Sequence, residues 1–268
     1  MSERIAHKRA IRQAFDRAAP GYDRAAIVQR ECCARLFALD AANPDPGSGP
    51  VQRLVDAGCG TGHALDTLRE LFPDALPIAL DFSPAMLRHA CASSSSAALP
   101  LCADLEHLPL QTDSIDLLWS SLAMQWCDPQ IVLQETARVL APGGRALIAT
   151  LGPRTLHELR SAFAAVDDAT HVIEFSTLSQ WTRSASVAGL DLLAGECAEL
   201  AALAPDLRTL LADIKAIGAH TVGEGRRRKA LGRQAWNLLQ QAYEQNRRTD
   251  GLLPATYDLV LLSLRKPA

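Results

Sequence analysis

The chain has 268 residues, a hydrophobic fraction of 48% and a formal net charge of −3, from 27 basic and 30 acidic side chains. This composition can bury a large core, which excludes a disordered chain. The charge balance excludes a protein whose whole surface follows nucleic-acid phosphates. Because the seven cysteines lack zinc-ligand spacing and the N-terminus lacks an apolar signal segment, we expect a reduced, cytoplasmic protein without a metal.

The N-terminal part is predicted to be helical over residues 4–18 and 21–42. Ala19-Pro20-Gly21 separates these helices, since proline lacks a backbone donor and glycine disfavours helix. A turn-rich linker covers residues 43–50. Strands are then predicted over 51–57, 77–80, 99–102, 115–120 and 145–150, with helices over 62–72, after Ser83-Pro84, and over 129–140. Such repeated strand–helix units predict a parallel sheet covered by helices.

The pattern changes after residue 152. Thr155-Leu-His-Glu158 has the form of a capping box that opens a helix. Another helix is predicted over 177–187, and helical stretches over 205–218 and 227–246. The remaining strands are predicted over 190–200 and 256–264.

The strongest motif is a glycine-rich turn, Val55-Asp-Ala-Gly58-Cys-Gly60-Thr-Gly62, between a predicted strand and a predicted helix. Alternate glycines let the backbone turn sharply and approach a ligand closely. A dinucleotide site spaces its glycines G-x-G-x-x-G, whereas here the spacing is G-x-G-x-G, with Asp56 two residues earlier. A carboxylate there would repel a pyrophosphate but can bind an ammonium group. The motif therefore favours S-adenosylmethionine, which has an α-amino group and no phosphate.

Acidic residues follow the next two predicted strands. Asp81 can accept hydrogen bonds from both ribose hydroxyls, because a carboxylate offers two acceptor oxygens, although NAD sites use the same arrangement. Asp104 can accept from the adenine amine. Phe82 and Leu105 are placed to flank the adenine ring, with core packing as an equal alternative.

The segment Ser120-Ser-Leu-Ala-Met-Gln125-Trp126 follows the fourth predicted strand. Ligands of open α/β sheets bind beyond the carboxyl ends of the strands, so we expect this segment beside the sulfonium. Trp126 is either a wall of the site, apolar or cation–π, or a core residue. The predicted cofactor-binding residues are Asp56, Gly58, Gly60, Gly62, Asp81, Phe82, Asp104, Leu105 and Ser120.

These features, together with the turn Pro142-Gly143-Gly144, resemble the class I S-adenosylmethionine-dependent methyltransferases over about residues 51–152. The resemblance implies an α/β fold with a seven-stranded Rossmann-like sheet, the last strand antiparallel. One structural domain is expected, with N-terminal helices over the active site (1–50) and a cofactor-binding half (51–152). Residues 153–268 would supply the remaining strands and helical lid insertions at about 153–188 and 201–251.

Several segments outside the cofactor-binding half support a narrower resemblance. They are Phe15-Asp-Arg-Ala-Ala-Pro-Gly-Tyr22-Asp23, Ser121-Leu-Ala-Met-Gln-Trp126, Thr150-Leu-Gly-Pro-Arg-Thr155-Leu-His-Glu158-Leu, Lys215-Ala-Ile-Gly218-Ala-His220 and Thr256-Tyr257. Together they resemble the malonyl-[acyl-carrier protein] O-methyltransferase family of biotin synthesis, over nearly the whole chain.

The narrower resemblance implies methyl transfer from S-adenosylmethionine to the free carboxylate of malonyl-acyl-carrier protein or malonyl-CoA. The methyl ester formed would start pimeloyl and biotin synthesis. A malonyl carboxylate is ionised at neutral pH and needs no general base, so we expect residues that orient it and no catalytic acid or base. The candidates are Tyr22, Gln125, Trp126, Lys215, His220 and Tyr257. Solvent exposure of Lys215, and packing or capping by the histidine and Tyr257, are equally compatible with the sequence.

A basic run, Arg226, Arg227, Arg228 and Lys229, with Arg233 after it, is a candidate docking surface for an acidic carrier protein. A solvated helix start is the alternative. Another small-molecule acceptor, or S-adenosylmethionine binding without catalysis, remains possible from the sequence. We expect a monomer that binds neither nucleic acid nor membrane.

Overall fold

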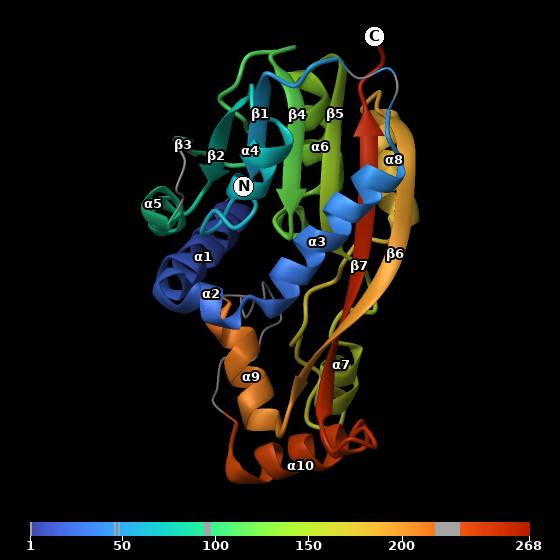
Figure 1. The fold of residues 1–268 in the computed structure, drawn as a ribbon. Helices are drawn as coiled ribbons and strands as arrows, with labels where there is room; N and C mark the ends of the chain where they lie inside the picture. The colour runs from blue at the N-terminus through green and yellow to red at the C-terminus, as the bar shows by residue number, and fades with distance from the viewer. Residues whose placement is uncertain (1, 46, 48, 94–97, 218–230) are drawn as a thin grey trace.

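The computed structural model describes residues 2–45, 47, 49–93, 98–217 and 231–268 (Figure 1). Its seven-stranded sheet has the order β3-β2-β1-β4-β5-β7-β6, and β7 runs antiparallel to both of its neighbours. The predicted sheet with an antiparallel last strand is therefore confirmed. The strands are β1 Arg53–Ala57, β2 Leu76–Asp81, β3 Leu99–Cys102, β4 Ile115–Ser121, β5 Leu140–Leu151, β6 Asp191–Ala204 and β7 Leu253–Arg265.

Helices cover both faces of the sheet, because the buried strands alternate their apolar side chains between the faces. Leu54 and Leu117 pack on the side of α3 and α7, whereas Val55 and Leu118 pack on the side of α6 and α8. The helices are α1 Ser2–Ala18, α2 Tyr22–Ala25, α3 Ile27–Ala42, α4 Leu65–Leu71, α5 Pro84–Ser93, α6 Pro129–Val139, α7 His157–Ala164, α8 Leu178–Val187, α9 Leu207–Ala216 and α10 Arg233–Glu244.

The molecule is elongated, because β6 and β7 continue together beyond the rest of the sheet (Figure 1). Their pairing runs to Ala204 opposite Leu253. At this far end α10 contacts α7, and α9 contacts α2 near the N-terminal helices. No helix in the described part of the chain combines the length and apolar character of a membrane span.

The predicted break at Pro20 is a short 3-10 turn, Ala19–Gly21, and Asp128 caps α6 through the backbone N–H groups of Gln130 and Ile131. The capping box predicted at Thr155 is wrong. Its hydroxyl instead accepts a hydrogen bond from the backbone N–H of Asp258, and α7 begins after Leu156, which has a left-handed φ of 53°. A contact across the sheet thus replaces the local cap.

Candidate functional site

The glycine-rich turn after β1 has the backbone that its sequence predicts. Gly58, Gly60 and Gly62 have φ values of 84°, 55° and 88°, which side chains disfavour. A Cβ on Gly58 would lie 2.2 Å from the Cβ of Ala123, so the turn packs directly against the segment after β4. The Gly58 backbone N–H also donates to the Leu80 carbonyl at 2.7 Å, which fixes the turn to β2.

Asp56 lies at the base of this turn with an unpaired acceptor. The residue is 2% exposed, and its Oδ2 is buried with no hydrogen-bond partner among the described residues. Burial, and then the nearby charge of Asp81, raises the pKa of this carboxyl to about 8. A cationic amine at Oδ2 would relieve both effects, so the site fits the α-amino group of S-adenosylmethionine.

Asp81, at the end of β2, is tied to the backbone on both sides. Its Oδ2 accepts from the Gly60 N–H at 3.0 Å, and its Oδ1 accepts from the Ser83 N–H at 2.8 Å. Burial raises the pKa of this carboxyl to about 6, against the lowering by those hydrogen bonds. Each carboxylate oxygen keeps a second lone pair, so the group can still accept from ribose hydroxyls.

Two neighbouring cavities adjoin these carboxylates. The smaller, of about 70 Å³, lies between α1 and the segments after β2, β3 and β4. The larger, of about 350 Å³, lies between the glycine turn and the start of α3. Both cavities share the wall formed by Tyr22, Gly58, Gly60 and Ser121. The predicted adenine contacts Phe82, Asp104 and Leu105 line the smaller cavity, whereas Asp56 and Gly62 line the larger one.

Helix α1 closes the smaller cavity with aromatic and charged contacts. The Phe15 ring meets the Phe82 and Trp126 rings edge-on, with centroid distances of 6.3 and 5.8 Å. Lys8 Nζ donates to Asp104 Oδ2 and to Glu106 Oε2, at 2.5 Å each. Although burial opposes it, these hydrogen bonds raise the pKa of Lys8 above its usual value. Asp104 therefore holds a protein cation beside the predicted adenine site.

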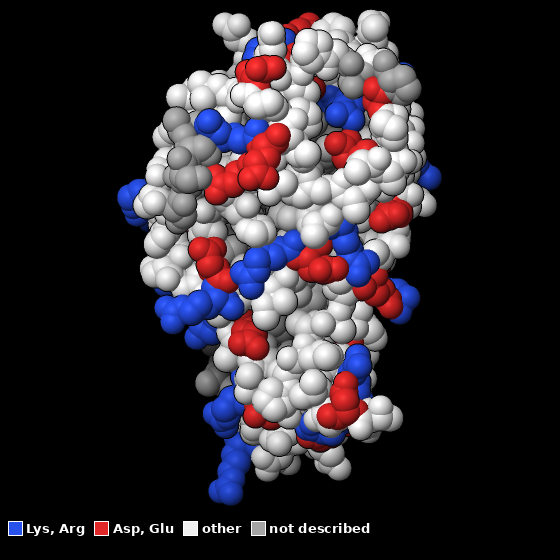
Figure 2. Space-filling view, in the orientation of Figure 1, with Lys and Arg blue, Asp and Glu red and all other residues white. Residues whose placement is uncertain are grey.

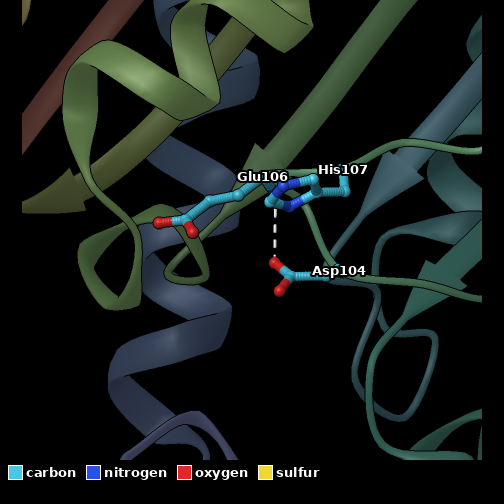
Figure 3. A group of neighbouring side chains, drawn as sticks. All are labelled: Asp104, Glu106 and His107. Carbon is cyan, nitrogen blue, oxygen red and sulfur yellow. Dashed lines mark hydrogen bonds between the residues drawn. The ribbon is translucent and has the colours of Figure 1, made fainter. Parts of the chain in front are cut away.

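Asp104, Glu106 and His107 come together on the loop after β3 (Figure 3). One ligand atom from each lies within 4.8 Å of the others, which is metal-ligand spacing. Lys8 already places its ammonium between the two carboxylates, however, and Glu106 also accepts from Arg4 and from the Asp128 N–H. We therefore interpret Asp104 and Glu106 as parts of an ion-pair network with Lys8 and Arg4 that anchors α1.

The segment after β4 differs in detail from the prediction. Ser120 is fully buried and its hydroxyl donates to the Ala57 carbonyl at 2.8 Å, so it ties β4 to β1. Ser121, on the other face of the strand, lines both cavities instead, because successive strand side chains alternate. Trp126 lines the smaller cavity. Gln125 lines neither of the two, and its Nε2 donates to the Leu122 carbonyl.

The other predicted substrate-orienting residues are scattered. Tyr22 lines both cavities, and burial raises the pKa of its hydroxyl, which stays protonated as a possible donor. Tyr257 is buried on β7 and lines neither cavity, and Lys215 is exposed on α9. Arg233 is exposed at the start of α10. His220, Arg226, Arg227, Arg228 and Lys229 lie outside the described residues.

Several cavity-lining residues were not named as site residues from the sequence, among them Lys8, Phe15, Gln29 and Ser121. Three of them lie in helices far from the glycine turn in sequence, and no local spacing relates them to it. The exception is Ser121, which strand alternation from Ser120 already made a candidate.

Comparison with known proteins agrees with this geometry. A family model described as a methyltransferase domain matches residues 55–148. A protein of Dechloromonas aromatica (strain RCB) named malonyl-[acyl-carrier protein] O-methyltransferase is 47% identical, over 97% of this chain and 95% of its own length. A protein of the same name from Laribacter hongkongensis (strain HLHK9) is 41% identical, over 97% of this chain and 90% of its own.

Solved structures share the fold at low sequence identity. A putative methyltransferase from Bacillus halodurans C-125 has a TM-score of 0.61 at 15% identity, with 88% of this chain and 100% of that chain covered. Geranyl diphosphate C-methyltransferase from Streptomyces coelicolor A3(2), solved with S-adenosyl-L-homocysteine, has a TM-score of 0.52 at 16% identity. That match covers 87% of this chain and 78% of the other.

Proposed function

The chain belongs to the malonyl-[acyl-carrier protein] O-methyltransferase family, and from this premise we propose that it methylates the free carboxylate of malonyl-acyl-carrier protein, with S-adenosylmethionine as methyl donor. The acceptor is proposed from the names of relatives that match nearly end to end. The donor is supported by one observation above all, the buried Asp56 Oδ2 without a partner beside the glycine turn. The methyl ester formed would start pimeloyl and biotin synthesis.

The protein residues bind and orient, and none is assigned as an acid or base. Asp56 receives the α-amino group, Asp81 the ribose hydroxyls, and Phe82 with Leu105 flanks the adenine ring. When bound, S-adenosylmethionine supplies an electrophilic methyl group and a thioether leaving group. The acceptor carboxylate is already ionised, so the protein has only to align its oxygen behind the methyl carbon and exclude water.

Burial of opposite charges favours this reaction. The positive sulfonium and the negative carboxylate become a neutral thioether and a neutral ester, so charge disappears toward the transition state. A site with low water content therefore assists the transfer. We propose that the helices before residue 43 and the helical segments within 201–251 cover the acceptor site; the contact of α9 with α2 supports this.

The experiment compares acceptors. Purified protein with S-adenosylmethionine should release S-adenosylhomocysteine with malonyl-carrier protein but not with acetyl-carrier protein, which lacks the carboxylate. Equal turnover of both, or none with malonyl-carrier protein and malonyl-CoA, would contradict the proposal. The ratio of kcat/KM for the two malonyl acceptors then decides whether the carrier protein is the preferred substrate.

A further inference from the structure

Five side chains that line the two cavities bury a polar atom without a hydrogen-bond partner among the described residues: Gln29, Asp56, Trp119, Ser121 and Trp126. Asp56 is proposed to bind the cofactor, and the Trp119 ring stacks on Phe37 in the core. Of the others, Gln29 through Oε1 and Trp126 through Nε1 lie in different cavities. Gln29 lines the larger cavity and Trp126 the smaller one. Buried polar atoms in native proteins are normally paired, and an unpaired one costs free energy. Two such atoms beside a predicted reaction site therefore indicate a ligand group that pairs with them.

Gln29 lies in the first turn of α3, and its buried amide oxygen has no hydrogen-bond partner among the described residues. The amide oxygen and nitrogen are nearly alike in shape, so a half-turn of the amide brings the NH₂ group to the buried position. The neighbouring Arg30 also lines the larger cavity, but its side chain is exposed and donates to the Asp23 carbonyl at 2.6 Å. Gln29 is thus the more buried donor of the two.

Trp126 offers a single polar group, the N–H of its indole ring. The Phe15 ring meets it edge-on at 84°, which holds the indole against α1. An indole N–H can only donate, so the missing partner must be an acceptor. Ser121, which belongs to the wall that both cavities share, also has a buried hydroxyl without a partner.

We propose that Gln29 and Trp126 are the residues that bind and position the acceptor's carboxylate, one donor for each oxygen. This inference rests on the proposed function, in which that carboxylate is the nucleophile. Gln29 lines one cavity and Trp126 the other, and the two cavities share a wall that includes Ser121 and the glycine turn. A carboxylate bound by both residues would lie at this wall, beside the turn expected to bind the cofactor. Neutral donors suit this role. A cation would neutralise more of the carboxylate's charge and so weaken it as a nucleophile, whereas neutral donors orient it with less loss of charge.

The test is steady-state kinetics with malonyl-CoA and S-adenosylmethionine for Gln29→Leu, Gln29→Glu and Trp126→Phe. We expect the KM for malonyl-CoA to rise by about 10-fold or more when either donor is lost. Gln29→Glu should raise the KM for malonyl-CoA more than Gln29→Leu does, because it places a second negative charge beside the acceptor carboxylate. The dissociation constant for S-adenosylhomocysteine, measured by calorimetry, should stay within about twofold, since the cofactor contacts are intact.

Matched controls are Gln130→Leu, an exposed glutamine in the first turn of α6, and Trp236→Phe on α10, because neither residue lines these two cavities. Both should keep the wild-type KM. An unchanged KM in the Gln29 and Trp126 variants would overturn the inference, as would an equal weakening of S-adenosylhomocysteine binding, which assigns the pair to the cofactor. Arg30→Gln is measured in the same way. A large rise in KM confined to this variant would also overturn the inference, because it would assign the carboxylate to Arg30. If wild-type protein fails to methylate malonyl-CoA and malonyl-carrier protein, the proposed function fails instead.

Discussion

At the residue scale, the protein keeps two carboxylates buried near one another at the end of the central strands. Asp81 shares its charge with two backbone N–H groups, whereas Asp56 has an oxygen without a partner. The pKa of Asp56 is accordingly raised further, to about 8, against about 6 for Asp81. Asp56 is thus the residue whose charge is least compensated by the protein itself and depends most on a bound cation.

The first prediction concerns stability and pH. Because the folded-state pKa of Asp56 lies above its unfolded value of 3.8, its contribution favours folding at low pH and is lost as the pH rises toward about 8. The urea midpoint of the ligand-free protein should therefore fall between pH 5 and about 8.5. Asp56→Asn should flatten this dependence, and the exposed Asp74→Asn control should leave it unchanged. A wild-type midpoint that rises over this range would contradict the assignment.

The second prediction concerns the cofactor. Asp56→Asn removes the charge but keeps the shape, so S-adenosylhomocysteine should bind on the order of 100-fold more weakly, as when one partner of a buried charge pair is lost. Calorimetric titration at pH 7.5 measures the dissociation constant, with Asp74→Asn as the control. Wild-type affinity in Asp56→Asn would exclude an ammonium contact at this carboxylate.

At the element scale, α1 is held over the smaller cavity by side-chain contacts to the loop after β3. Lys8 and Arg4 pair with Glu106, which is almost fully buried, and Lys8 also pairs with Asp104. The cavity beneath α1 measures about 70 Å³, whereas small-molecule sites usually enclose about 300–1,000 Å³. A neighbouring cavity of about 370 Å³ is also lined by Lys8, Phe82 and Asp104. We expect α1, or the side chains that it carries, to move when an adenosine group binds.

The third prediction follows from this anchoring of α1. Lys8→Met keeps the length of the side chain but removes its two ion pairs, so α1 should open more readily and S-adenosylhomocysteine should dissociate faster, by about 5-fold or more. Stopped-flow displacement measures the rate. Gln13→Met, on the exposed side of the same helix and outside the lining of the cavities, is the control. A rate unchanged by Lys8→Met would show that α1 does not limit exchange.

At the scale of the whole molecule, the net charge of −3 conceals local differences. Figure 2 shows acidic and basic side chains mixed over the face in view. In the sequence, the basic run at residues 226–229 precedes Arg233. Arg233 is exposed at the start of α10. We propose this run as a docking surface for the acidic carrier protein, since opposite charges accelerate encounter.

The fourth prediction tests that docking surface. Replacement of Arg226, Arg227, Arg228 and Lys229 by glutamate should raise the KM for malonyl-carrier protein more than the KM for malonyl-CoA, because only the carrier has an acidic protein surface. The effect on the carrier should diminish at high salt. Equal changes with both acceptors would exclude carrier docking at this run.

The sequence by itself determined the sheet and the glycine-rich turn after β1. Strand and helix periodicity is local, so all the predicted strands were found, within a few residues of their predicted ends. Asp56 and Asp81 were predictable together, because the carboxyl ends of neighbouring parallel strands share one edge of the sheet. Gly58 was identifiable because its backbone conformation and close packing require a residue without a side chain.

Only the tertiary structure decided what lies over that edge. Lys8, Phe15 and Gln29 line the cavities because α1 and α3 pack beside the glycine turn. The spacing of residues in the sequence did not predict which side chains of these helices would face the cavities. Thr155 shows the same limit, since a partner on β7, distant in sequence, outcompetes the local cap that its motif predicted. Contacts between distant segments depend on how whole elements pack, and these contacts form the walls that α1 and α3 contribute to the two cavities.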